Sequence, residues 1–145
     1  MKLTEKTVLA GVSDALRDLV MPNVADGYTR EAVRLAQQLV QQLARGIDDA
    51  AERRVEENRA IRVLLTQGAE NCTAPELAAR LAQGAASADP GLKLSVLDAE
   101  TARLRAQLVE LQEWLETQDS VETQALSARI WRELRLFEQA RAPRD

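Results

Sequence analysis

Residues 97–115 read LDAETARLRAQLVELQEWL, and in this stretch a leucine or a threonine returns at steps of four and three. The repeating positions are Leu97, Thr101, Leu104, Leu108, Leu111 and Leu115. Such steps place side chains on one face of a helix, in the seam that packs at shallow crossing angles in bundles and coiled coils. We therefore predict an all-α protein that folds as a helical bundle.

A second helix is predicted directly after this seam. The stretch Asp119-Ser-Val-Glu122 is typical of a helix N-terminus. The apolar repeat that follows it consists of Leu126, Ile130, Leu134 and Phe137. Because only a few residues separate the two helices, we expect an antiparallel C-terminal hairpin.

The region before the seam predicts a short helix and a connection. Thr73-Ala-Pro-Glu76 fits a capping box, and the helix that it starts is expected to end at Gly84. Residues 83–91 then combine two glycines, a proline and small residues. This composition predicts a flexible connection, which a protease should cut first.

The N-terminal part predicts one ordinary helix and one very long helix. Residues 4–20 form the first, which Pro22 ends. No proline interrupts residues 29–67, so we predict a single helix of about 60 Å that ends at Gly68. Between residues 52 and 59 its only large apolar side chain is Val55, so this middle is exposed, kinked near Gly46, or facing something polar.

The whole chain, residues 1–145, is expected to form one domain of about five helices. A chain of this length buries one core, and 46% hydrophobic with only 3% aromatic residues indicates a core of leucine, valine, isoleucine and alanine. The long helix exceeds partners of about 20 residues. One of its ends should therefore be covered by the short helix, by a second copy or by another protein.

Catalysis is not expected, because the chain has no histidine and one cysteine. We predict no enzyme activity, no cofactor and no metal site. Asp48, Glu52 and Glu56 would share one face of the long helix, which could hold a hard cation, but interspersed arginines favour a solvated, ion-paired surface. Cys72 is either a reactive thiol or a small filler beneath a loop.

Charge and hydropathy exclude other classes of partner. The net charge of -4 attracts neither nucleic acid nor anionic lipid. The longest apolar runs are much shorter than a bilayer span, and the N-terminus lacks the apolar core of a secretion signal. We expect a soluble protein in the cytoplasm.

Four residues are candidates for binding a partner or a ligand. Asn58 and Arg62 lie one turn apart beside the sparse apolar stripe of the long helix, where an amide can fix helix register or bind a partner. Trp114 and Trp131 each lie one step from a leucine or isoleucine seam, so each either flanks the core or marks a contact surface.

The N-terminal half resembles a bacterial family of small helical proteins of unknown function, which accompany acyl-CoA dehydrogenases and aminoglycoside-phosphotransferase-like kinases. The similar segments are Ala15-Leu-Arg-Asp-Leu-Val-Met-Pro22, Asp26-Gly27, Arg34-Leu-Ala and Glu57-Asn58-Arg-Ala-Ile61. They cover under half of the chain, and the C-terminal half departs from the pattern. The resemblance implies an accessory role beside such an enzyme and assigns no catalytic residue.

These features predict a non-catalytic interaction or accessory protein, which self-associates or docks on a partner enzyme through the long helix. The alternative is a helical bundle that binds a small molecule, of acyl or acyl-CoA type, between the helices at 29–67 and 95–115. In that case Asn58 or a nearby arginine would orient the ligand.

Overall fold

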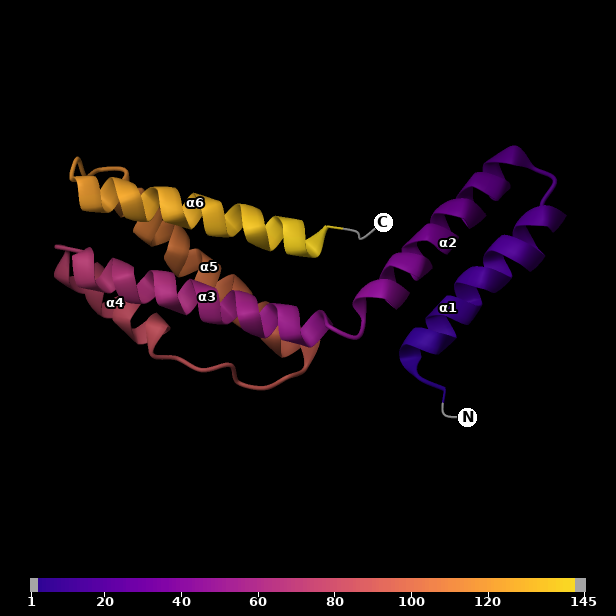
Figure 1. The fold of residues 1–145 in the computed structure, drawn as a ribbon, viewed down its shortest axis with the longest axis horizontal. Helices are drawn as coiled ribbons and strands as arrows, with labels where there is room; N and C mark the ends of the chain where they lie inside the picture. Colours follow the sequence, from indigo (N-terminus) through magenta and orange to yellow (C-terminus); the bar gives the residue numbers. More distant parts are fainter. Residues whose placement is uncertain (1–2, 143–145) are drawn as a thin grey trace. The chain divides into compact units, whose positions relative to one another are not determined.

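The computed structural model describes residues 3–142, which form six α-helices and no strand (Figure 1). The predicted all-α class is confirmed. The described residues divide into two compact units, one ending at Ala50 and one spanning Ala51–Ala142. The single bundle that we predicted over residues 1–145 stays a prediction.

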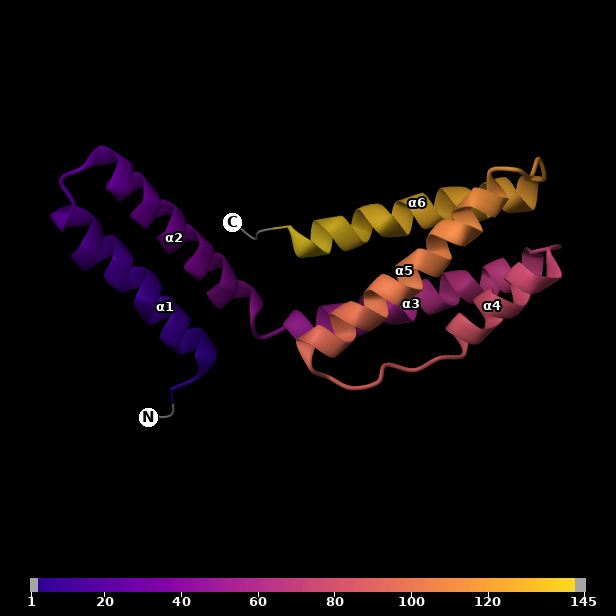
Figure 2. The ribbon, with the colours of Figure 1, turned by 180° about the vertical axis from the view of Figure 1, so that it is seen from behind.

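The first unit is an antiparallel helical hairpin (Figures 1 and 2). Helix α1 (Glu5–Ala15) continues into a π-helical turn, η1 (Leu16–Val20), and a 3-10 turn, η2 (Met21–Asn23), before α2 (Gly27–Gly46) returns. The Asp26 carboxylate accepts a hydrogen bond from the Thr29 amide at 2.7 Å, so Asp26 caps the start of α2. We name this unit the N-terminal hairpin.

The second unit contains four helices: α3 (Ala50–Asn71), α4 (Pro75–Ala85), α5 (Leu94–Leu115) and α6 (Val121–Arg141). All four contribute to one apolar core. Its buried members are Ile61, Leu64, Leu65, Leu77, Leu81, Leu104, Leu108, Leu111, Leu115, Leu126, Ile130 and Phe137. The last four positions of the seam, from Leu104 to Leu115, therefore form the α5 side of this core. Helices α5 and α6 form the predicted antiparallel hairpin (Figure 2).

The predicted single helix over residues 29–67 is wrong. The chain leaves helical geometry between Gly46 and Ala50, so α2 and α3 are separate helices that belong largely to different units. Glycine is a poor helix former, and aspartates such as Asp48 and Asp49 compete for backbone hydrogen bonds in helix interiors. The absence of proline was thus not sufficient to keep the helix continuous.

The predicted helix end at Gly68 is also wrong, because α3 continues to Asn71. Gly68 instead lies where α3 closely approaches α5. A β-carbon built on Gly68 would lie 2.4 Å from Cδ2 of Leu111. Gly68 is therefore needed for close packing of two helices.

The capping box at Thr73 is not formed. Ala74 is the N-cap residue of α4 and has no side chain that can cap, and Pro75 is the first helical residue. The residue before a proline is disfavoured in the helical region, so Ala74 is extended and the helix starts one position later than predicted. The predicted start of α6 also shifts by one residue. The motif began at Asp119, but the N-cap residue is Ser120, whose hydroxyl accepts a hydrogen bond from the Thr123 amide at 3.2 Å.

Candidate functional site

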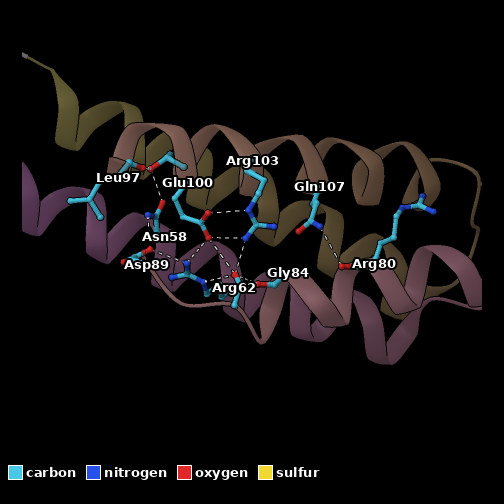
Figure 3. A network of polar contacts seen from close by, with 11 residues as sticks. Asn58, Arg62, Arg80, Gly84, Asp89, Leu97, Glu100, Arg103 and Gln107 are labelled. Atoms are coloured by element: carbon cyan, nitrogen blue, oxygen red, sulfur yellow. Dashed lines mark hydrogen bonds and ion pairs between the residues drawn. The ribbon is translucent and has the colours of Figure 1, made fainter. Parts of the chain in front are cut away.

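Two of the predicted site residues, Asn58 and Arg62, meet at the connection between α4 and α5 (Figure 3). The Asn58 amide donates to Oδ1 of Asp89 at 2.9 Å, and Nη2 of Arg62 donates to the same oxygen at 2.8 Å. Asp89 belongs to the stretch that we predicted to be flexible. Its carboxylate therefore connects that stretch to α3 through two hydrogen bonds.

Asn58 is fully buried, with an exposed fraction of 0%. Its amide oxygen accepts from the Thr101 hydroxyl at 2.6 Å, and that hydroxyl also lies 2.9 Å from the backbone oxygen of Leu97. The amide therefore joins α3 to α5 and to the connection at the same time. This arrangement matches the register-fixing role among the alternatives for Asn58.

A carboxylate on α5 completes the network. Glu100 is 7% exposed and receives Nη2 of Arg62 at 2.8 Å and Nη2 of Arg103 at 2.7 Å. The Arg103 guanidinium, followed by that of Arg62, holds the pKa of Glu100 below its usual range, although burial opposes this shift. Arg103 also donates to the Ser87 hydroxyl at 2.8 Å, and that hydroxyl donates to the Gly84 carbonyl at 2.6 Å.

This network is balanced in charge, since two guanidiniums face the carboxylates of Asp89 and Glu100. Its members satisfy one another and leave no group poised to attack or to accept a proton from a substrate. The network ties residues 84–89 to α3 and α5. We therefore interpret it as a structural latch, which we call the connection latch.

A second ionic cluster lies at Glu57, the residue before Asn58 on α3. Glu57 is 6% exposed and its carboxylate is shared by two guanidiniums, with Nη2 of Arg105 at 2.6 Å and Nη2 of Arg141 at 2.7 Å. Arg105 also lies 3.4 Å from Glu138, a well-exposed residue. Of the three explanations for the polar middle of the long helix, the structure supports two: the helix is interrupted after Gly46, and the face at Glu57 meets polar partners.

The two tryptophans have different surroundings. Trp114 is partly buried and packs against the core. Trp131 is 51% exposed and lines a groove between α5 and α6, of about 350 Å³, together with Leu108, Val109, Gln112, Ile130 and Leu134. Trp114 thus flanks the core, whereas Trp131 lies at a surface where contact could occur.

The N-terminal hairpin presents an exposed apolar face along α2 and the residue that follows it. Leu35, Leu39, Leu43 and Ile47 are 50%, 62%, 61% and 36% exposed, although the spacing of the last three fits the apolar stripe of a helix. The positions of α2 that are buried in the structure are Gln37 and Ala44. We call the four exposed residues the leucine face.

The remaining candidates do not assemble a chemical site. Asp48 lies in the break between α2 and α3 and pairs with Lys6 at 2.7 Å, so it does not share a helix face with Glu52 and Glu56 as predicted. Cys72 is partly buried against the core, with Sγ 3.6 Å from the Ala74 carbonyl oxygen. Within residues 3–142, no group of three or more potential ligands could hold a metal ion, and no helix has the length and apolar character of a membrane span.

For several of these residues the neighbouring sequence gives no indication of the contact that they make. Glu57 and Arg141 are 84 positions apart, so their pairing depends on the tertiary fold. The leucine face did have a signal: α2 carries Leu35, Leu39 and Leu43 next to the apolar positions Val33 and Val40, which widens its apolar side to about half of the helix circumference. An apolar side of this width is more than one neighbouring helix covers.

Comparison with known proteins found no relative of this chain. No family model, no curated protein and no solved structure matches the chain.

Proposed function

We propose that this chain is a non-catalytic interaction protein that self-associates through the leucine face of its N-terminal hairpin. The observation that carries this proposal is the exposure of a continuous leucine stripe on a unit that has almost no apolar core. The occupant to which we commit is a second copy of the same chain.

The hairpin cannot be stabilised by its own burial alone. Among its described residues, those that are buried are Ser13, Gln37, Ala44 and Ala50, and none is a large apolar side chain. Gln37 donates to Ser13 at 2.9 Å, so the centre of the α1–α2 interface is polar. A segment of about 50 residues needs further burial, a metal or oligomerisation to compensate its conformational entropy.

The position of the leucine face on α2 leaves it free for a third helix. At 100° per residue, Leu35 and Leu39 lie on the side away from Gln37 and Ala44, which face α1, and Leu43 lies on the flank of the helix between these two sides. Near its end, Ile47 and Val8 line one shallow hollow with Leu3 and Leu9. Pairing two such hairpins about a two-fold axis would give a four-helix bundle with the leucine faces inside.

The charge of the N-terminal hairpin favours a second copy of the chain, over a strongly charged protein, as the partner of the leucine face. Up to Ala50 the sequence has six basic and seven acidic residues, so the unit carries only one of the four net negative charges of the chain. Its charges are also paired internally, as in Arg17 with Asp14 and in Arg34 with Glu31. Two identical hairpins can therefore approach with little repulsion, and the interface would be apolar.

The test is the mass of the full chain in solution as a function of concentration. Sedimentation equilibrium from nanomolar to high micromolar concentration should show a monomer of 16.0 kDa converting to a species of twice that mass. A wild-type chain that stays monomeric throughout this range would refute the proposal.

A pair of variants locates the interface. Leu39→Glu places a charge on the leucine face twice per dimer, and at about 1.5 kcal/mol for each lost leucine the dissociation constant should rise more than about 100-fold. Gln38→Glu adds the same charge one position earlier, on the exposed polar side of α2, and should leave the constant unchanged. Equal effects of the two variants would show that the leucine face is not the interface.

A further inference from the structure

The exposed side of α2 extends beyond the leucine face toward both ends of the helix. Near the start of α2, Tyr28 is 85% exposed and Ala32 is also exposed. Near its end, Gln42 is exposed and Gly46 is the last helical residue. With two of the leucines these residues recur at steps of four and three, which places them along one line of the helix surface. We call this line the outer seam, and it consists of Tyr28, Ala32, Leu35, Leu39, Gln42 and Gly46.

The sizes of the residues along the outer seam are complementary to the same seam read backwards. A second copy of α2 can run in the opposite direction, with a two-fold axis midway between Leu35 and Leu39. Tyr28 of one copy then faces Gly46 of the other, and Ala32 faces Gln42. Each outer layer pairs a large residue with a small one, and the central layers pair two leucines. Such alternation fills an interface between helices at an even density.

A parallel pairing in the same register fits the outer seam less well. Each residue would then face its own equivalent in the second copy. Two Tyr28 rings would share the first layer and two Gly46 residues the last. The first layer would be overfilled and the last would contain a void, and both defects destabilise an interface.

Electrostatic interactions favour the antiparallel direction as well. The dipoles of two neighbouring helices attract when the helices run in opposite directions. Glu31 and Arg45 flank the outer seam on one side, each directly before a small residue of the seam. The antiparallel pairing brings Glu31 of one copy near Arg45 of the other, whereas the parallel pairing keeps them at opposite ends. Glu31 already pairs with Arg34 of its own helix, and exposed ion pairs add little, so packing of the layers decides the direction.

We propose that the outer seam binds the α2 helix of a second copy in antiparallel orientation, with Leu35 of each copy facing Leu39 of the other. This inference rests on the proposed self-association through the leucine face, and it adds the partner segment, the direction and the register. Tyr28, the most exposed of the seam residues named above, is then covered at both ends of the interface.

The test is disulfide cross-linking between single-cysteine variants of the full chain. Cys72→Ser removes the native thiol, and Leu35→Cys and Leu39→Cys are made separately in that background. In an equimolar mixture the antiparallel register places a thiol at position 35 against one at position 39. Two thiols at position 35 are offset by about 6 Å along the helix axis, which puts their Cα atoms beyond the roughly 7 Å that a disulfide spans.

We expect the mixture, treated with oxidised glutathione, to form covalent dimers at least about tenfold faster than either variant alone. Arg34→Cys is the matched control, because position 34 lies at nearly the height of Leu35 but about 100° around α2. Its mixture with Leu39→Cys should not cross-link.

Sedimentation equilibrium of the reduced variants, at the same concentration, separates the two ways in which this inference can fail. Cross-linking of each variant with itself as fast as in the mixture would overturn the antiparallel register. A non-covalent dimer that the mixture does not cross-link would overturn it too. A wild-type chain that stays monomeric would instead refute the self-association itself, and this inference with it.

Discussion

Gly68→Ala tests how closely α3 and α5 pack. The added β-carbon would lie 2.4 Å from one methyl carbon of Leu111 and 2.8 Å from the other, whereas carbon atoms in contact are about 3.5–4.0 Å apart. Leu111 would have to retreat by more than an ångström, but it is 0% exposed in the core. Overpacking of this kind costs about 1–3 kcal/mol.

A second effect of Gly68→Ala would raise the stability of the second unit. Alanine is favoured over glycine in a helix interior by about 1 kcal/mol. Because the overlap with Leu111 is severe, we expect overpacking to dominate and Gly68→Ala to destabilise the second unit by about 1–2 kcal/mol. For a unit of about 90 residues this corresponds to a melting temperature lowered by roughly 4–15 °C.

Urea unfolding followed by circular dichroism measures this change, and two controls separate the effects. Gly11 lies inside α1, and a β-carbon at this position would have no neighbouring atom within 4 Å, so Gly11→Ala should be neutral or stabilising. In a Leu111→Ala background the overlap is gone, and Gly68→Ala should then stabilise by up to about 1 kcal/mol. A Gly68→Ala chain more stable than the wild type would refute the close-packing argument.

Three further outcomes are expected. Asn58→Ala should destabilise the second unit by about 1–3 kcal/mol in urea unfolding, since it leaves buried polar partners unpaired; an unchanged midpoint would contradict the connection latch. Arg103 lowers the pKa of Glu100, so the stability that this carboxylate contributes is present at neutral pH and is lost as the pH falls below the ordinary glutamate pKa of 4.5. Acid should therefore destabilise the Glu100→Gln variant less than the wild type. Limited proteolysis with mass spectrometry should show the first cut near residues 47–49, where the two units meet in the sequence. A first cut in residues 83–91 would instead favour the flexible connection that the sequence predicted.

The sequence predicted the all-α class and the C-terminal hairpin because both depend on local periodicity. The steps of four and three from Leu97 to Leu115 identify the buried side of α5 directly. The same reasoning offered a kink near Gly46 as one of three alternatives but did not predict two separate helices, since weak helix formers lower the stability of a helix without a fixed threshold at which it ends. It also missed the start of α4, where the restriction that Pro75 imposes on Ala74 outweighed the capping box.

The polar contacts were less accessible to sequence reasoning. Asn58 and Arg62 were identified because they interrupt an apolar pattern, but their common partner Asp89 lies about 30 residues away in a segment that composition marks as flexible. Nothing local to Asp89 or Glu100 indicates that they face the same guanidinium. Such pairings arise only when the helices have packed, so periodicity finds the position of a buried polar group and not its partner.

The connection latch has a consequence for the rate at which the second unit opens. The hydrogen bonds that Asn58 and Arg62 make within it join residues 25 to 43 positions apart in the sequence, so they can form only after α3 has met α5 and the connection. Interactions that form after the folding barrier slow unfolding and leave the folding rate almost unchanged. The loop between α4 and α5 therefore contributes to the lifetime of the folded unit, by delaying the first separation of its helices.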